Sequence, residues 1–368
     1  MGKNVIIFSD GTSNTKATNT NVYQFYKALN NNPDNKCFYD PGVGSFKGDL
    51  AGKIFGAGLA TNIQQCYDFI VSHYETDDRL FLFGFSRGAY TVRSLGSYVS
   101  LVGLVEKNRK RLHAGGPSHH KKQQLTVQQK YGRSAFDIYR SGKTPAFKAA
   151  LRELSKRQDL KACPVFGMGV WDTVGAIGLP NSDRDKEAFG EHYYHRMSLP
   201  KGIVHAYHAL SIDDERQEFA PILFTGDIND GASVEQCWFP GMHSDIGGGY
   251  KLNRKDPNAK ELSNISLGWM ADKFSSVLDF DRSLFDDGDA NGFIHDSISG
   301  FAENIYERKK RAVPKDAQLH PSVLERIKGP LSGGEVDMPY RPVALNSGGF
   351  RVNYELPPWY ALEKRYTL

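Results

Sequence analysis

The sequence has few cysteines and no long apolar stretch. Its four cysteines, Cys37, Cys66, Cys163 and Cys237, are far apart among 368 residues and form no CxxC pair, which excludes a zinc knuckle and a disulfide framework. The apolar run at residues 5–8 is too short for the core of a signal peptide, and no later run approaches the ~20 residues of a membrane span. We therefore expect a chain that is cytoplasmic as synthesised, whose export, if any, uses no cleaved signal peptide.

The chain also lacks a strong net charge. A net charge of +4 and a pI near 8.6 are too mild to indicate nucleic acid, and we expect no nucleic-acid partner. Residues 107–133 differ, because they hold eight Lys or Arg and three His but no acid. Such a run is typical of a solvated loop. The alternative is a basic surface that meets anionic phosphate, in lipid headgroups or in RNA.

Strand-like and helix-like patterns alternate along the chain, which predicts an α/β fold with a mainly parallel sheet and helices on both faces. We expect a single domain over residues 1–368, with a basic, lid-like helical insertion at about 106–160 and a helical and loop region at about 251–368. The predicted strands are residues 5–8, 37–39, 79–83, 164–170 and 234–239, and the predicted helices include residues 22–29 and 63–71.

The chain contains one GxSxG motif, Gly84-Phe85-Ser86-Arg87-Gly88, between an apolar run and a helical pattern. A serine on a very tight strand-to-helix turn needs small residues two positions away on each side, because larger side chains would meet the strand and helix backbones. The motif therefore predicts a nucleophile elbow with Ser86 as the nucleophile. A plain strand-to-helix turn is the alternative.

A serine nucleophile needs a base and an orienting carboxylate. Asp172 and His243 each follow an apolar strand-like run, and the order serine, acid, histidine is that of α/β hydrolases. Asp172 could instead cap a turn. His205 and His208, in an apolar and helix-like stretch, are rival bases, although a histidine there is more often satisfied in the core. Asp245 is a rival acid, but a residue two positions after the histidine usually points elsewhere, so we expect it to brace the glycine turn that follows.

The amino-terminal FSDGTSNT resembles the DxDGT motif of haloacid-dehalogenase phosphatases, but Phe8 stands where that motif has its nucleophile. Phosphoryl transfer at this site is therefore not expected. A loop after an early strand can instead supply one oxyanion-hole N–H, and the residue after the nucleophile supplies the other. We expect these donors to be the backbone of Gly11 or Thr12 together with that of Arg87, with Asp10 bracing the loop.

Four sets of motifs in one order resemble a known family. FSDGTSNT with TNTNVYQFY, then GFSRGAYTVR, VWDTVGAIG, and finally HALSIDDERQEFAP with WFPGMHSDIGGGY are similar to the α/β-hydrolase domain family that includes the phospholipase effectors of type VI secretion. The resemblance runs from about residue 4 to 275, with a weaker echo at residues 320–327. It implies the triad Ser86, Asp172 and His243, and a substrate class of glycerophospholipid acyl esters.

The sequence as a whole predicts a phospholipase-type serine esterase that needs neither metal nor cofactor, because no further metal ligands accompany His243 at a set spacing. The expected partners are a phospholipid or membrane surface and an immunity or delivery protein. Two alternatives stay open: an esterase or thioesterase acting on a soluble substrate, and a non-catalytic binding module built on a hydrolase fold.

Overall fold

A computed structural model of the chain describes residues 2–42, 55–105, 160–175, 198–226, 231–250, 260–298, 306–329 and 340–347. Nearly all of the predicted basic insertion and the end of the carboxyl-terminal region lie outside these residues. The division of the chain into one domain with an insertion therefore stays a prediction.

The core of the protein is a seven-stranded sheet in the order β2-β1-β3-β6-β7-β8-β9, in which every neighbouring pair is parallel. A separate antiparallel pair joins β4 to β5. The strands are β1 (Asn4–Ser9), β2 (Asn35–Asp40), β3 (Arg79–Phe85), β4 (Leu104–Val105), β5 (Leu160–Lys161), β6 (Val165–Trp171), β7 (His205–Ser211), β8 (Ser233–Phe239) and β9 (Gln318–Leu319).

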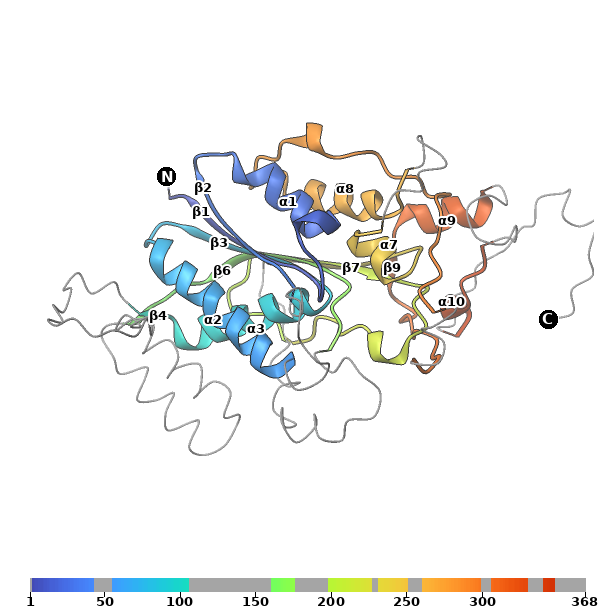
Figure 1. Cartoon of the computed structure of the whole chain (residues 1–368), viewed down its shortest axis with the longest axis horizontal. Helices are drawn as coiled ribbons and strands as arrows, with labels where there is room; N and C mark the ends of the chain where they lie inside the picture. The colour runs from blue at the N-terminus through green and yellow to red at the C-terminus, as the bar shows by residue number, and fades with distance from the viewer. Residues whose placement is uncertain are drawn as a thin grey trace, which may run out of the picture.

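Helices cover both faces of the sheet, with α1 and α8 on one side and α2 and α3 on the other (Figure 1). The described helices are α1 (Asn21–Asn30), α2 (Phe55–His73), α3 (Arg87–Val102), α7 (His243–Gly247), α8 (Ser263–Phe274), α9 (Pro321–Lys328) and α10 (Val343–Ser347), with 3-10 turns at Lys16–Thr18, Gln217–Phe219 and Arg282–Leu284.

Strand β1 shows why these strands are apolar throughout. Val5 and Ile7 pack into the cluster under α2 and α3, whereas Ile6 and Phe8 pack into the cluster under α1 and α8. All four side chains are fully buried. Because both faces of a parallel sheet are covered, its strands read as continuous apolar runs. The α/β class and the two-sided arrangement predicted from the sequence are confirmed.

A third apolar cluster joins the carboxyl-terminal elements to the sheet. Leu210 of β7 and Trp238 of β8 pack there against Val323 of α9 and Leu345 of α10. Strand β9 extends the sheet beside β8 at the same place, through pairs such as Trp238 with Leu319. Strand β9 and helices α9 and α10 are therefore part of the folded core.

Four strands differ from the sequence prediction. The stretch around His208, which we expected to be helix-like, is strand β7, and the two-residue strands β4, β5 and β9 were not predicted. A short apolar run that is buried on both faces has no alternation, so periodicity cannot distinguish it from a buried helix. Two residues, Gln318 and Leu319, are too few to leave a pattern. No helix in the described part of the chain is both long and apolar enough to cross a membrane.

Candidate active site

The GxSxG segment forms a strained turn between β3 and α3. Ser86 has φ 59° and ψ −124°, a backbone region that non-glycine residues rarely occupy. A Cβ atom on Gly84 would lie 2.6 Å from the carbonyl oxygen of Gly88, and one on Gly88 would lie 2.1 Å from that of Ser9. Both glycines are therefore required by close backbone packing, as expected for a nucleophile elbow.

Ser86, His243 and Asp172 form one hydrogen-bonded chain at the carboxyl ends of β3, β8 and β6. The distance from His243 Nδ1 to Asp172 Oδ2 is 2.6 Å, and that from His243 Nε2 to Ser86 Oγ is 2.7 Å. An ionised carboxylate only accepts hydrogen bonds, so Nδ1 carries the proton and Nε2 of the neutral ring accepts from the serine hydroxyl. The structure thus places side by side the three residues that the sequence analysis predicted to form a triad.

Burial and charge set the ionisation of this chain of groups. Burial raises the pKa of Asp172, but the guanidinium of Arg311 and the imidazole of His243 outweigh burial and hold that pKa well below its usual range. Burial lowers the pKa of His243, and the hydrogen bond to Asp172 compensates only in part. At neutral pH the arrangement is therefore a carboxylate beside a neutral imidazole, the state in which a histidine can accept a proton.

Two aromatic rings fix the orientation of the His243 imidazole. The ring centroid of Phe85 is 4.6 Å from it, and that of Phe219 is 4.9 Å away at an angle of 82°. The backbone N–H of His243 donates to Asp214 Oδ2 at 3.2 Å, and Asp214 is in turn paired with Arg216 at 2.6 Å. His243 is therefore held at its ring and at its backbone.

Arg311 is a site residue that sequence reasoning missed. Its guanidinium donates to both oxygens of Asp172, with Nη1 at 2.6 Å from Oδ1 and Nη2 at 2.8 Å from Oδ2. In the sequence it is the last residue of Lys309-Lys310-Arg311, and such a run reads as a solvated surface. No local signal distinguishes the buried cation from its exposed neighbours.

The loop after β1 lies against Ser86. A Cβ atom on Gly11 would lie 3.1 Å from the Cβ atom of Ser86. Asp10 braces this loop, since its carboxylate accepts from Thr20 Oγ1 at 2.6 Å and from the Gly11 N–H at 2.7 Å. The Gly11 N–H is therefore already engaged, which favours Thr12 as the oxyanion donor. The buried Thr12 Oγ1 has no hydrogen-bond partner among the described residues.

Arg87 is the first residue of α3, directly after Ser86. The first N–H groups of a helix have no acceptor within the helix, so the Arg87 N–H is suited to bind an oxyanion at this turn. Burial lowers the pKa of the Arg87 side chain to about 10, which leaves it cationic at neutral pH.

Asp245 is not the partner of His243. Its carboxylate accepts from the backbone N–H of Met242 at 2.9 Å and lies 2.6 Å from His295 Nδ1. A Cβ atom on Gly241 would lie 2.6 Å from the Asp245 Cβ atom. Asp245 therefore braces the turn between β8 and α7, which precedes it, whereas the sequence led us to expect a brace for the glycine turn that follows.

The rival histidines have structural partners. His208 is fully buried in β7, and its Nε2 accepts from the Thr173 N–H at 3.1 Å. Burial lowers its pKa to about 3, so it is a neutral core histidine. His205 Nδ1 lies 3.2 Å from the hydroxyl of Tyr207. Neither histidine contacts Ser86 in any described interaction.

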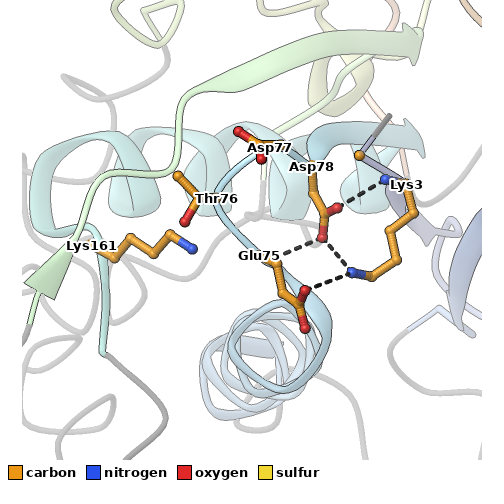
Figure 2. A pocket seen from close by; sticks show the side chains of 7 residues that line it. Lys3, Glu75, Thr76, Asp77, Asp78 and Lys161 are labelled. Atoms are coloured by element: carbon orange, nitrogen blue, oxygen red, sulfur yellow. Dashed lines mark hydrogen bonds and ion pairs between the residues drawn. The ribbon is translucent and has the colours of Figure 1, made fainter.

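A hollow of about 750 Å³ lies at the opposite edge of the sheet (Figure 2). Lys3, just before β1, lines it and contacts Asp78 at 2.7 Å and Glu75 at 4.0 Å. These residues precede β1 and β3, whereas the candidate site follows the carboxyl ends of the strands. In the part of the chain that the structure describes, no three His, Cys, Asp or Glu side chains come together as metal ligands would.

The family model of the catalytic domain of Tle1-like phospholipase effectors of the type VI secretion system (T6SS) matches residues 3–273. The chain belongs to this family. The α/β-hydrolase fold agrees with that membership. The resemblance found in the sequence motifs is thereby confirmed.

Three relatives illustrate the range of this similarity. The uncharacterized protein YEL023C of Saccharomyces cerevisiae is 26% identical over 245 residues, which are 61% of this chain and 33% of YEL023C. An uncharacterized Pseudomonas aeruginosa protein has a TM-score of 0.44 at 17% identity, covering 77% of this chain and 47% of its own. The Tle1 effector, solved bound to the VgrG spike, has a TM-score of 0.40 at 19% identity, covering 68% and 52%. The chain thus spans a third of the curated relative and about half of each solved one.

Proposed function

We propose that this Tle1-like domain is a serine hydrolase that cleaves acyl esters of glycerophospholipids. The observation that carries the proposal is the hydrogen-bonded chain from Ser86 through His243 to Asp172, with the serine on a strained elbow. Family membership supports the substrate class, since the family is one of phospholipase effectors.

In the proposed reaction, His243 Nε2 takes the hydroxyl proton of Ser86 as Oγ attacks the ester carbonyl carbon. Asp172 accepts from Nδ1 and stabilises the imidazolium that forms. The backbone N–H groups of Arg87 and Thr12 stabilise the oxyanion. His243 then protonates the departing alcohol, which leaves an acyl group on Ser86, and water activated by the same imidazole releases the fatty acid.

The proposal is tested first with a fluorophosphonate probe, which reacts with an activated serine. The wild type is expected to be labelled at Ser86, and Ser86→Ala to lose the label. Ser72→Ala is the control, because Ser72 is exposed and its hydroxyl donates to the Asp68 carbonyl at 2.7 Å. Folded wild type without label would favour a binding module on a hydrolase fold.

A panel of acyl esters tests the substrate class. Phospholipids with long acyl chains, presented as vesicles, should be hydrolysed faster than short soluble esters or thioesters. Turnover that ignores the lipid surface and prefers soluble esters would contradict the phospholipase assignment. It would leave the serine hydrolase mechanism intact.

We also propose two partners for the protein. A phospholipid surface is the first, and the basic segment around Lys121 and Lys122 is expected to contribute to binding it. Charge reversal at both lysines should weaken binding to vesicles that contain anionic lipid, and unchanged binding would contradict this role. The second partner is a delivery or immunity protein, and we propose that the chain is cytoplasmic as synthesised.

A further inference from the structure

Arg311 reaches the candidate site from a segment beyond residue 273, where the match to the family model ends. The backbone before it runs antiparallel to the loop after β7, with an isolated bridge between Arg216 and Arg308 and a hydrogen bond from the Lys309 N–H to the Glu215 carbonyl at 2.6 Å. After it, Val313 is buried in the third apolar cluster. The segment is therefore fixed on both sides of Arg311.

All five N–H groups of this guanidinium are used. Two donate to the carboxylate of Asp172, as described above. The other three donate to carbonyl oxygens: Nη1 to Ser211 at 2.8 Å, Nη2 to Phe219 at 2.7 Å and Nε to Asp214 at 3.1 Å. These carbonyls lie at the end of β7 and in the loop after it. One side chain thus joins the acid to the loop that carries the aromatic neighbour of His243.

This geometry determines how Asp172 meets the base. Asp172 has a positive φ of 38°, a conformation that surrounding contacts must hold in place. A planar fork bound to both carboxylate oxygens fixes the plane of the carboxylate, so that Oδ2 faces His243. The remaining acceptor capacity of Oδ1 is filled by the Ser211 N–H at 3.0 Å. A single cation without the fork would neutralise the charge but leave the carboxylate free to rotate.

Arg311 also balances the charges that face the imidazole. Asp172 and Asp214 are the acids around His243, and Arg311 and Arg216 are their guanidinium partners. Removal of Arg311 would leave two carboxylates against one guanidinium. Since uncompensated negative charge stabilises an imidazolium, the base would then remain protonated up to a higher pH.

We propose that Arg311 is a positioning residue of the active site, which orients the carboxylate of Asp172 toward His243. It also offsets the negative charge of that carboxylate, so that the imidazolium form of His243 is stabilised less. The catalytic apparatus therefore extends past residue 273 into the carboxyl-terminal segment. This inference depends on the proposed function, because it takes His243 to be the base that activates Ser86.

The test compares Arg311→Gln and Arg311→Lys with the wild type. The readouts are circular dichroism, the rate of fluorophosphonate labelling as a function of pH, and kcat and KM for a short soluble ester. For Arg311→Gln we expect the labelling rate and kcat to fall on the order of 10²-fold, with little change in KM. The acid limb of its profile of labelling rate against pH should move to higher pH. Arg311→Lys should keep the acid limb near that of the wild type and recover part of the rate, because it restores the charge without the fork.

Arg326→Gln is the matched control. Arg326 is also a buried arginine of the carboxyl-terminal segment, but its Nη1 donates to the Ala290 and Gly292 carbonyls at 2.7 Å. Its replacement should lower stability while the folded protein keeps the labelling rate and pH profile of the wild type. A loss of rate equal to that of Arg311→Gln would show that any buried arginine here has the same effect, and would overturn the proposal.

Chemical rescue gives an independent readout. Arg311 lines a hollow of about 300 Å³ together with residues such as Ile212, Asp213 and Tyr340, which provides a route for a small cation. Guanidinium chloride at concentrations that do not unfold the protein should raise the labelling rate of Arg311→Ala several-fold. The wild type and Arg326→Gln should not respond.

Three outcomes would overturn the proposal. Folded Arg311 variants could label at the wild-type rate with an unchanged pH profile, guanidinium could fail to rescue Arg311→Ala, or every Arg311 variant could fail to fold, which would make the role of the residue structural. A wild type that is not labelled at Ser86 would be a different failure, because it would refute the proposed function itself and this inference with it.

Discussion

Replacement of Gly88 by alanine should displace the loop that carries Thr12, the proposed oxyanion donor. The new Cβ atom would lie 2.1 Å from the Ser9 carbonyl oxygen and 2.5 Å from that of Asp10, whereas Cβ atoms are essentially never found closer than 3.0 Å to another atom. The helix and the strand must therefore separate by about 0.9 Å, the difference between 2.1 and 3.0 Å. A misplacement of this size at a reacting centre costs about 10²-fold in rate, and overpacking costs about 1–3 kcal/mol of stability.

The assay is fluorophosphonate labelling of Ser86 together with urea unfolding. Gly268→Ala is the matched control, since Gly268 lies within α8 and nothing is within 4 Å of its Cβ position. There the same substitution should raise stability by about 0.5–1 kcal/mol, because glycine is a poor helix former, and should leave labelling unchanged. The reasoning about the elbow is refuted if Gly88→Ala labels at the wild-type rate and unfolds at the same urea concentration as the wild type.

Three further predictions concern ionisable groups and the choice of base. Because burial lowers the pKa of His243, the acid limb of kcat/KM should lie below pH 6.5, and a limb above that value would contradict the site described here. His243→Ala should reduce labelling by roughly 10³-fold or more, whereas His208→Gln should retain it within a few-fold; the reverse result would make His208 the base. Burial raises the pKa of Asp40 to about 7, so its contribution to stability is full below about pH 4 and is lost as the pH rises through 7. Relative to Asp40→Asn, the wild type should therefore lose up to about 4 kcal/mol over that range in urea unfolding, and a difference that does not vary with pH would exclude this.

The local parts of this site could be predicted from the sequence, because their signals are local. Gly84 and Gly88 flank the serine at the spacing that the tight turn demands, and the structure shows the backbone atoms that forbid a Cβ at either position. Asp172 and His243 follow apolar runs that become parallel strands, and parallel strands bring their carboxyl ends to one edge of the sheet. Three residues that are distant in sequence could thus be assigned to one place.

The parts that could not be predicted depend on contacts between distant segments. Arg311 follows two lysines, and it is carried into the core by contacts such as the bridge between Arg216 and Arg308 and the cluster around Val313. Similarly, the engagement of the Gly11 N–H by the Asp10 carboxylate follows from the shape of the loop. Residue type and spacing alone do not determine either arrangement.

The most direct test of the central claim is mass spectrometry of the lipid products released from phospholipid vesicles by the wild type and by Ser86→Ala, both shown to be folded. The account predicts free fatty acid and lysophospholipid with the wild type, and no product above the enzyme-free background with Ser86→Ala. Equal product from the two proteins would contradict it.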